Sequence, residues 1–302
     1  MTVCFDIGGS TIKAAVAPRP EDPVALGKRD TPADDFAAFC RAVGELAEAS
    51  GETATPLSIA IAGVVDPESG RIKVANIPCI DGRPLADDLG TALGRPVVVT
   101  NDADCFALAE ATIGAGRGHG IVFGIILGTG VGGGVVVAGR LLTGAGGFAG
   151  EWGHGPILAQ RVGDPPVDIP WLPCGCGQSG CVDTIGGARG MERLHHQLTH
   201  RTMKSRAVMD AWRAGDPEAV RTFNCYIELV AQPLALCVNL LGADIVPVGG
   251  GLGRETDMLA ILDDAVRQRL LRTTTAPLVV PGQCSGNPAF IGAALIAEAH
   301  AS

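Results

Sequence analysis

The chain has 302 residues, of which 47% are hydrophobic and 18% charged, and its formal net charge is −9 at pH 7. This length and composition allow two domains with large buried cores, while the acidic balance argues against a nucleic-acid or anionic-membrane partner. No apolar run reaches the roughly 20 residues that cross a bilayer, and no secretory leader precedes the first strand, so we expect a cytoplasmic protein.

Hydrophobic periodicity predicts strands and helices along the whole chain. In chain order we expect strands at 3–7 and 12–16, a helix from 34 or 35 to about 50, strands at 57–62 and 97–99, a helix at 103–114, strands at 121–127 and 135–137, helices at 190–198 and 216–241, a strand at 245–248, a helix through 259–266, a strand at 278–280 and a last helix from about 289. Pro233 is expected to kink the longest helix, because proline removes an intrahelical hydrogen bond.

Three glycine-rich turns follow apolar strands at well separated places in the chain. Their residues are Asp6, Gly8, Gly9, Ser10 and Thr11 in the first, Gly128, Thr129, Gly130, Gly132, Gly133 and Gly134 in the second, and Gly249, Gly250 and Gly251 in the third. Glycine leaves backbone N–H groups accessible, which suits the phosphates of a nucleoside triphosphate. We expect the first two turns to hold phosphates, with Mg²⁺ near Asp6, and the third to contact adenosine. None of them is a Walker or a Rossmann motif.

Two further features carry candidate chemistry. A strand ends at Asn101 and Asp102, where an acid at the start of a helix is either a catalytic group or a helix N-cap. Cys174, Cys176 and Cys181, with His154 upstream, have the ligand number and softness of a closed zinc site. The alternatives for the cysteines are chance clustering or a disulfide knot, and the scattered remaining cysteines favour reduced thiols.

Together these motifs resemble the ROK family of sugar kinases. The resemblance rests on residues 6–11 (DIGGST), 101–103 (NDA), 127–134 (LGTGVGGG), 150–154 (GEWGH) and 174–181 (CGCGQSGC), and it extends from about residue 3 to about residue 295. It implies an α/β, actin-like and hexokinase-like (ribonuclease H-like) fold, with two lobes built on mixed sheets and a cleft between them. The expected lobes are residues 1–116 with about 289–302, and residues 117–288, which include the zinc loop. It also implies a homodimer.

The resemblance further implies ATP-dependent phosphorylation of a sugar, with Mg²⁺ on the phosphates and structural Zn²⁺ beneath the sugar. Residues 75–78 (ANIP), 101–108 and the zinc loop are most similar to bacterial N-acetylglucosamine kinases, which implies transfer to the 6-hydroxyl of N-acetyl-D-glucosamine. By position, Asp102 matches the general base of the family. The matching sugar-contacting positions are Gly63, Asn76, Asn101, Asp102, Glu151, His154 and Asp183.

Individual residues add detail to this expectation. His154 would bind zinc through one ring nitrogen and face a sugar hydroxyl with the other, since metal binding fixes the tautomer. Asn76 would lie near the acetamido group, or else serve only as a turn residue before Pro78. The chain departs from the family at Ser10, where threonine is usual, and at Asp183, where a longer glutamate usually touches the sugar.

Other functions remain open on the sequence. N-acetylmannosamine kinase and glucokinase differ from the favoured activity only in contacts around C2. A non-catalytic sugar-sensing regulator is the alternative from another class, and regulators of this family carry an N-terminal DNA-binding domain. Here Asp6 already belongs to the first glycine turn, so we do not expect such a domain.

Overall fold

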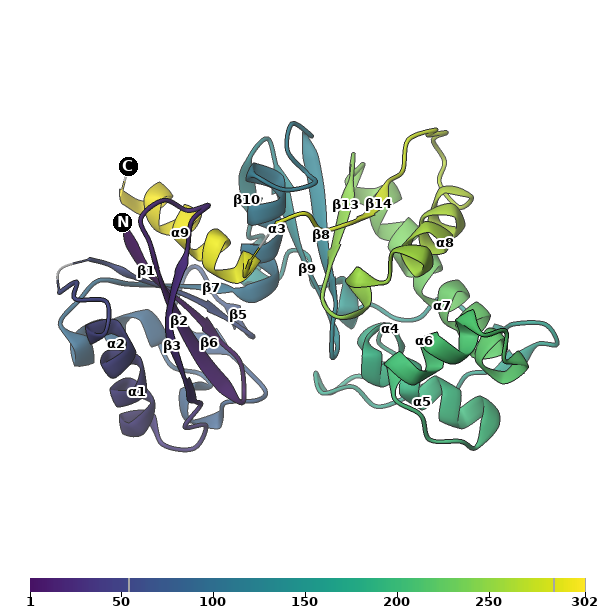
Figure 1. Cartoon of the computed structure of the whole chain (residues 1–302), viewed down its shortest axis with the longest axis horizontal. Coiled ribbons are helices and arrows are strands. Elements are labelled where there is room, and N and C mark those ends of the chain that lie inside the picture. Colours follow the sequence, from purple (N-terminus) through teal and green to yellow (C-terminus); the bar gives the residue numbers. More distant parts are fainter. Residues whose placement is uncertain (54, 285, 302) are drawn as a thin grey trace. The chain divides into compact units, whose positions relative to one another are not determined.

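The computed structural model describes residues 1–53, 55–284 and 286–301. The chain forms two compact units (Figure 1). The first comprises Met1–Gly118, Gly134–Ala149 and the C-terminal segment from Gln283, and the second comprises His119–Gly133 and Gly150–Gly282. The lobe boundaries expected at 116/117 and 288/289 stay a prediction; the compact units differ from those lobes mainly in assigning 134–149 to the first unit.

The first unit is built on a five-stranded mixed sheet in the order β3-β2-β1-β4-β7. β1 pairs antiparallel with β2 and parallel with β4, and β4 pairs parallel with β7. The strands are β1 (Thr2–Ile7), β2 (Thr11–Ala17), β3 (Val24–Asp30), β4 (Leu57–Ile61) and β7 (Val97–Asn101), and a small hairpin consists of β5 (Val64–Val65) and β6 (Ile72–Lys73). β4 is buried along its whole length because it lies inside the sheet with both faces covered.

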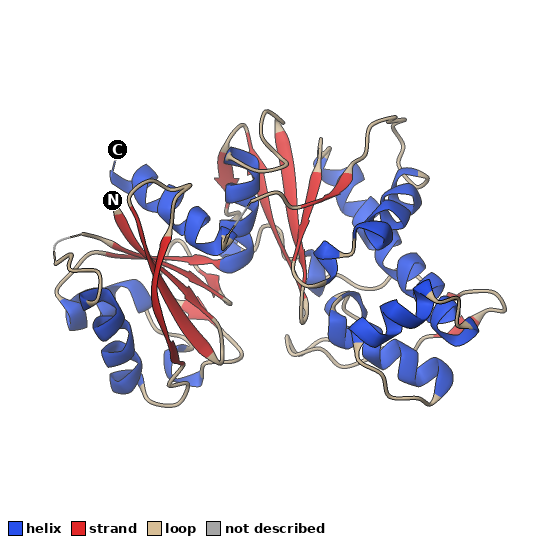
Figure 2. Ribbon diagram, viewed as in Figure 1, coloured by secondary structure: helices blue, strands red, loops and turns tan. Residues whose placement is uncertain are grey.

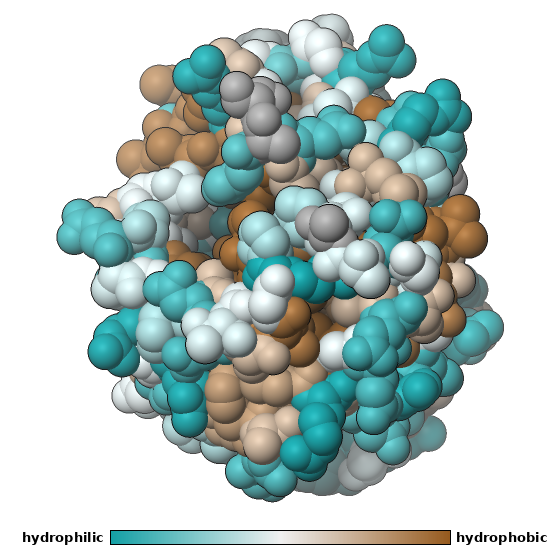
Figure 3. Space-filling view, turned by 90° about the vertical axis from the view of Figure 1, so that its left-hand side faces the viewer, coloured by the Kyte–Doolittle hydropathy of each residue, from teal (hydrophilic) through white to brown (hydrophobic). Residues whose placement is uncertain are grey.

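Helices cover both faces of this sheet (Figure 2). They are α1 (Phe36–Glu48), α2 (Leu85–Leu93), α3 (Asp102–Thr112) and α9 (Pro288–Ala301), with the short 3-10 helices η1 (Pro78–Ile80) and η2 (Ala145–Gly147). α1 begins as expected, since Asp35 Oδ1 accepts a hydrogen bond from the Ala38 N–H at 3.0 Å. α9 packs on β1 and β4 and also against α3. Figure 3 shows polar residues interspersed with apolar ones on the face of the protein that it displays.

The second five-stranded sheet has the order β10-β9-β8-β13-β14. Its strands are β8 (Ile121–Leu127), β9 (Val131–Val137), β10 (Arg140–Leu142), β13 (Val246–Gly249) and β14 (Val279–Pro281), and a separate hairpin consists of β11 (Arg161–Val162) and β12 (Val167–Asp168). β13 pairs parallel with both β8 and β14. The boundary between the two units falls inside β9, after Gly133.

The helices of the second unit are α4 (Asp183–Gly186), α5 (Ala188–Thr199), α6 (Ser205–Arg213), α7 (Pro217–Leu241) and α8 (Thr256–Arg267), with η3 (Trp152–His154) and η4 (Leu252–Arg254). α7 is long and apolar enough to cross a membrane by length and composition alone, but 56% of its apolar window is buried inside the fold, as in a core helix. Pro233 lies within this single helix, and the expected kink stays a prediction.

The structure corrects several sequence-based expectations. β3, α2 and α6 were not predicted: β3 is exposed along nearly its whole length and so lacks a buried apolar alternation, while α2 and α6 have only 9 residues each, which gives a short periodic pattern. The second glycine turn is also shorter than expected, since β9 begins at Val131 and contains Gly132 to Gly134. Gly133 and Gly134 fit a strand here because neighbours lie close: an added Cβ would meet Trp152 at 2.8 Å and Ala107 at 2.9 Å, respectively.

Candidate functional site

The carboxyl ends of three parallel strands gather the candidate residues of the first unit. β1, β4 and β7 run in the same direction, with Ile7 opposite Ile61 and Ile61 opposite Asn101. Asp6 therefore lies near the end of β1, and Asn101 ends β7. Ligands of open α/β sheets bind at this edge, where the strands end and the connecting loops begin.

Asp6 is held by two side chains that the sequence analysis did not single out. Its Oδ2 atom accepts hydrogen bonds from Lys13 Nζ and Asn287 Nδ2, both at 2.8 Å. Lys13 is opposite Asp6 in the β1–β2 register, so the hairpin pattern contained a signal for this pair. Asn287 comes from the segment before α9, and nothing in the local sequence pointed to it. Oδ2 is thus engaged by two side chains of the protein, and the expected role of Asp6 near Mg²⁺ stays a prediction.

The first glycine turn packs directly on Asn76. The Gly8 N–H donates to the Thr11 carbonyl at 3.0 Å and closes the turn, while Thr31 Oγ1 donates to the Gly8 carbonyl at 2.7 Å. A Cβ on Gly9 would lie 2.8 Å from the Cβ of Asn76, so glycine is required at this position. Asn76 is exposed beside this turn. Its expected contact with an acetamido group stays a prediction.

Asn101, and not Asp102, caps helix α3. Asn101 Oδ1 accepts the N–H groups of Ala103 at 2.8 Å and Asp104 at 3.1 Å, and its Nδ2 donates to the Gly63 carbonyl at 3.0 Å. Asp102 is the first residue of the helix and is half-buried. The alternative interpretation of Asp102 as the N-cap was therefore wrong. Gly63 and Asn101, both predicted to contact sugar, are joined by this hydrogen bond.

The second glycine turn, Gly128 to Gly130, is held by residues from distant parts of the second unit. The Gly128 N–H donates to the Gly130 carbonyl at 3.0 Å, and the Ala188 N–H donates to the Gly128 carbonyl at 2.8 Å. Directly after the turn, the Val131 N–H donates to Asp183 Oδ1 at 2.7 Å. Asp183 lies against Gly130, where a Cβ would collide with its carboxylate. The structure thus gives Asp183 a bond to the end of the turn, while its predicted sugar contact stays a prediction.

The third glycine run lies next to this same turn. Gly249 ends β13, and Gly250 has a φ of +84°, which favours glycine. A Cβ on Gly250 would collide with the carbonyl of Leu127 and lie 2.7 Å from the Gly128 nitrogen. The two glycine segments therefore pack backbone to backbone, as expected for one nucleotide site, although their contacts with a nucleotide remain predicted.

Glu151 directly precedes η3, and His154 is the last residue of this short helix. The His154 Nε2 atom is 3.7 Å from Glu151 Oε2, while Nδ1 on the other side of the ring is 3.6 Å from Cys174 Sγ. Burial raises the pKa of the Glu151 carboxyl; the nearby His154 opposes this shift and the Asp183 charge adds to it. The imidazole thus links the cysteine loop to a carboxylate, which agrees with two distinct roles for its two nitrogens.

The cysteine loop and His154 form a compact candidate metal centre. The ligand atoms of His154, Cys174, Cys176 and Cys181 all lie within 4.8 Å of one another. Cys176 and Cys181 Sγ are 3.7 Å apart. A tetrahedral zinc with Zn–S bonds of about 2.3 Å and a Zn–N bond of about 2.05 Å requires S···S edges of about 3.8 Å and S···N edges of about 3.6 Å. The 3.7 Å and 3.6 Å separations match two of these edges, and the other ligand atoms lie within 4.8 Å of one another, so the group is compact enough to be a candidate zinc site.

The loop is shaped for this cluster by its own backbone. The Cys174 N–H donates to the Gln178 carbonyl at 2.8 Å, and Gly180 has a φ of +77° and lies against the Trp171 ring. A bridge between Pro156 and Cys181 connects the loop with the segment that carries His154. Burial raises the pKa of the Cys181 thiol to about 12 without a metal, so zinc binding would have to release this proton.

The predicted residues form two local groups. Asp6, residues 8–11, Gly63, Asn76, Asn101 and Asp102 belong to the first unit, and residues 128–133, Glu151, His154, Asp183, the cysteines and residues 249–251 belong to the second. Gly134 belongs to the first unit, where it packs against α3. The first unit thus contains one of the three glycine segments and the second unit contains the other two, and each unit has at least one predicted carboxylate.

Comparison with known proteins gives consistent relatives along the full chain. The model of the ROK family matches residues 2–300. An N-acetylgalactosamine kinase of Shewanella sp. is 35% identical over 97% of this chain and 95% of its own, and an N-acetyl-D-glucosamine kinase of Salmonella dublin is 33% identical over 91% and 92%.

Solved structures are similar over the same length. A ROK hexokinase from Thermus thermophilus has a TM-score of 0.83 and 30% identity, with 99% of this chain and 98% of that chain covered. A ROK family glucokinase from Streptomyces griseus, in complex with glucose and AMPPNP, has a TM-score of 0.80 and 29% identity, with 99% of both chains covered. The α/β, hexokinase-like fold expected from the sequence is thereby confirmed.

Proposed function

Since the chain belongs to the ROK family and is an ATP-dependent sugar kinase, we propose that its acceptor is the 6-hydroxyl of N-acetyl-D-glucosamine. The products would be N-acetylglucosamine 6-phosphate and ADP. The observation that carries this proposal is the set of full-length relatives named as kinases of acetamido sugars. The exposed amide of Asn76, which lies against the first glycine turn, supplies a group that can recognise an acetamido substituent.

Asp102 is the proposed general base. The carboxylate takes the proton of the 6-hydroxyl as that oxygen attacks the γ-phosphorus, and the bond to the β–γ bridging oxygen breaks with its electron pair leaving on ADP. Asn101 supports this role because it caps α3 by itself and fixes the helix start from which Asp102 projects. The cap of α3 is thus Asn101, and Asp102 is the first residue of the helix.

The two glycine turns are the proposed phosphate sites, with Gly249 to Gly251 beside the adenosine. Glycine is needed at positions 9, 130 and 250 because each of these residues has a close neighbour within its own unit. Mg²⁺ bound to the nucleotide would neutralise phosphate charge, with Asp6 as its nearest protein carboxylate. Lys13 and Asn287 keep that carboxylate oriented through one oxygen.

Zinc held by His154, Cys174, Cys176 and Cys181 would supply structural support, and the chain itself would do the sugar binding. His154 Nε2 and Glu151 Oε2 face each other and offer a donor and an acceptor to sugar hydroxyls. Glu151 is half-buried, and partial burial strengthens such hydrogen bonds. The expected homodimer and the cytoplasmic location stay predictions.

The test is a panel of sugars assayed by coupled ADP detection. Wild-type protein should phosphorylate N-acetylglucosamine with a higher kcat/KM than N-acetylmannosamine or glucose, and the product should carry phosphate at O6. Asp102→Asn should retain sugar binding while turnover falls by at least about 100-fold, since general-base catalysis contributes that much. Glucose as the best acceptor would overturn the proposed substrate, and no turnover with any sugar would favour the regulator.

One second candidate is favoured by a specific observation. The Shewanella relative, at 35% identity, is named for N-acetylgalactosamine, which differs from N-acetylglucosamine only in the configuration at C4. Both substrates share the 2-acetamido group and the 6-hydroxyl. Including both sugars in the panel therefore decides the C4 preference without affecting the assignment of the base.

A further inference from the structure

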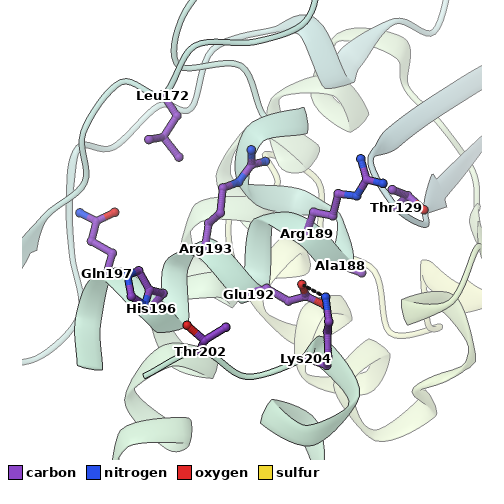
Figure 4. A pocket seen from close by; sticks show the side chains of 10 residues that line it. All are labelled: Thr129, Leu172, Ala188, Arg189, Glu192, Arg193, His196, Gln197, Thr202 and Lys204. Carbon is purple, nitrogen blue, oxygen red and sulfur yellow. Dashed lines mark hydrogen bonds and ion pairs between the residues drawn. The ribbon is translucent and has the colours of Figure 1, made fainter. Parts of the chain in front are cut away.

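A cationic cavity lies beside the second glycine turn, entirely within the second unit (Figure 4). Its volume is about 810 Å³, and α5, the loop between α5 and α6 (Thr202 and Lys204) and Thr129 line most of it. Arg189, Arg193 and Lys204 contribute positive charge, and Glu192 contributes the opposing one. In a chain with a net charge of −9, such a local excess of cations selects an anionic ligand.

The three cationic side chains differ in whether they already have a hydrogen-bond or ion-pair partner within the protein. Lys204 Nζ is paired with Glu192 Oε2 at 3.2 Å, and an Arg193 guanidinium nitrogen donates to the Thr184 carbonyl at 2.7 Å. Within residues 1–53, 55–284 and 286–301, no hydrogen bond or ion pair engages the Arg189 side chain. Arg189 is exposed, and Figure 4 shows it extending toward Thr129.

The glycine turn brings its own unused donors to the same place. In the described part of the chain, the N–H groups of Thr129 and Gly130 donate to no protein acceptor. α5 is fixed against this turn, because the Ala188 N–H binds the Gly128 carbonyl at 2.8 Å and a Cβ on Gly187 would lie 2.6 Å from the Thr129 carbonyl oxygen. Arg189 therefore directly follows Ala188, whose backbone is hydrogen-bonded to the turn.

We propose that this cavity takes the phosphate chain of the nucleotide donor and that Arg189 is the cation that binds it. The assignment rests on the proposed kinase function and adds a residue that the three glycine segments do not include. A guanidinium presents paired N–H groups that match phosphate oxygens, and the free N–H groups of the turn complete the set of donors. The Arg189 guanidinium would add a positive charge beside the uncharged backbone N–H donors of the turn.

The experiment compares Arg189→Gln with wild type in the full-length protein. Calorimetry would give the dissociation constants of ADP and adenosine, and inorganic tripolyphosphate would be tested as a competitor of ADP. Loss of one charged hydrogen-bonding partner should weaken ADP binding by about 10- to 100-fold. Tripolyphosphate should compete with ADP more weakly by a similar factor, and the dissociation constant of adenosine should be unchanged. Arg189→Lys should restore part of the lost affinity for ADP.

Arg206→Gln is the matched control, because Arg206 is an exposed arginine on α6 that does not line the cavity. It changes the net charge equally and should leave ADP binding within about twofold. Unfolding midpoints of both variants should equal that of wild type, since both side chains are exposed. A shared loss in both variants would show a general charge effect and overturn the role of Arg189.

The remaining outcomes separate this inference from the proposed function. If wild type phosphorylates a sugar but Arg189→Gln binds ADP normally, the inference is wrong and the kinase assignment stands. If adenosine loses as much affinity as ADP, Arg189 contacts the base, and the phosphate assignment is overturned. If no sugar is phosphorylated while tripolyphosphate binding still depends on Arg189, the acceptor proposal fails and the phosphate site stands.

Discussion

Replacing Asp183 tests whether this carboxylate serves the nucleotide turn or the sugar. Asp183 Oδ1 accepts the Val131 N–H at 2.7 Å, at the residue where the turn passes into β9. A hydrogen bond to a charged group contributes roughly 1.5–3 kcal/mol, and Asp183 is only half-buried, so the lower end applies. Asp183→Ala should therefore loosen the turn by about 1.5 kcal/mol, which corresponds to about a tenfold rise in the KM for ATP.

Asp183→Asn refines this test because it keeps an acceptor oxygen and removes only the charge. It should retain part of the bond to Val131 and raise the KM for ATP by less than Asp183→Ala does. Both variants also remove the charge that helps to raise the Glu151 pKa, so that pKa should fall. Initial-rate kinetics with ATP varied at saturating sugar, and the reverse, provide the two Michaelis constants.

Asp168→Ala is a suitable control, because Asp168 is an exposed carboxylate on β12 of the same unit. Its Michaelis constants should match those of wild type. If Asp183→Ala raises the KM for the sugar and leaves that for ATP unchanged, Asp183 acts as a sugar ligand and the reasoning from the Val131 bond is refuted.

Three further predictions concern the metal, the pH and the packing. Cys176→Ser should lose bound zinc by elemental analysis and lower both the unfolding midpoint and sugar affinity; an unchanged midpoint would argue against structural zinc. Burial lowers the pKa of His195, so on acidification the unfolded chain binds a proton before the folded chain does. The free energy of unfolding should therefore fall as the pH drops below about 6.5. Urea unfolding midpoints measured against pH should show this fall, and His195→Leu should make the midpoint less dependent on pH. Gly134→Ala should cost about 1–3 kcal/mol in urea unfolding, because its Cβ would lie 2.9 Å from the Ala103 carbonyl oxygen, while Gly27→Ala, with 3.5 Å to Leu46, should be tolerated.

Local sequence patterns were enough to predict the elements that carry the chemistry. The strand over Ile121–Leu127 was predicted at its observed bounds, and the long helix expected at 216–241 is observed at Pro217–Leu241, with Asp216 as its cap. The four members of the candidate metal centre could also be named in advance, because three cysteines and a histidine at such spacing are typical of a zinc site; zinc itself stays a prediction. In each case the signal lies in residues close together in the chain.

Distant contacts, in contrast, were decided only by the tertiary structure. Asn287 reaches Asp6, and Asp183 reaches Val131, because strands and helices far apart in sequence pack together. Arg189 looked like an ordinary surface arginine until the fold placed it next to Thr129 and left it without a partner in the described chain. The sequence by itself determined which polar groups the protein contains. The tertiary structure decided which of them bind other groups of the protein and which remain accessible to a ligand, because a hydrogen bond depends on distances that only the folded chain sets.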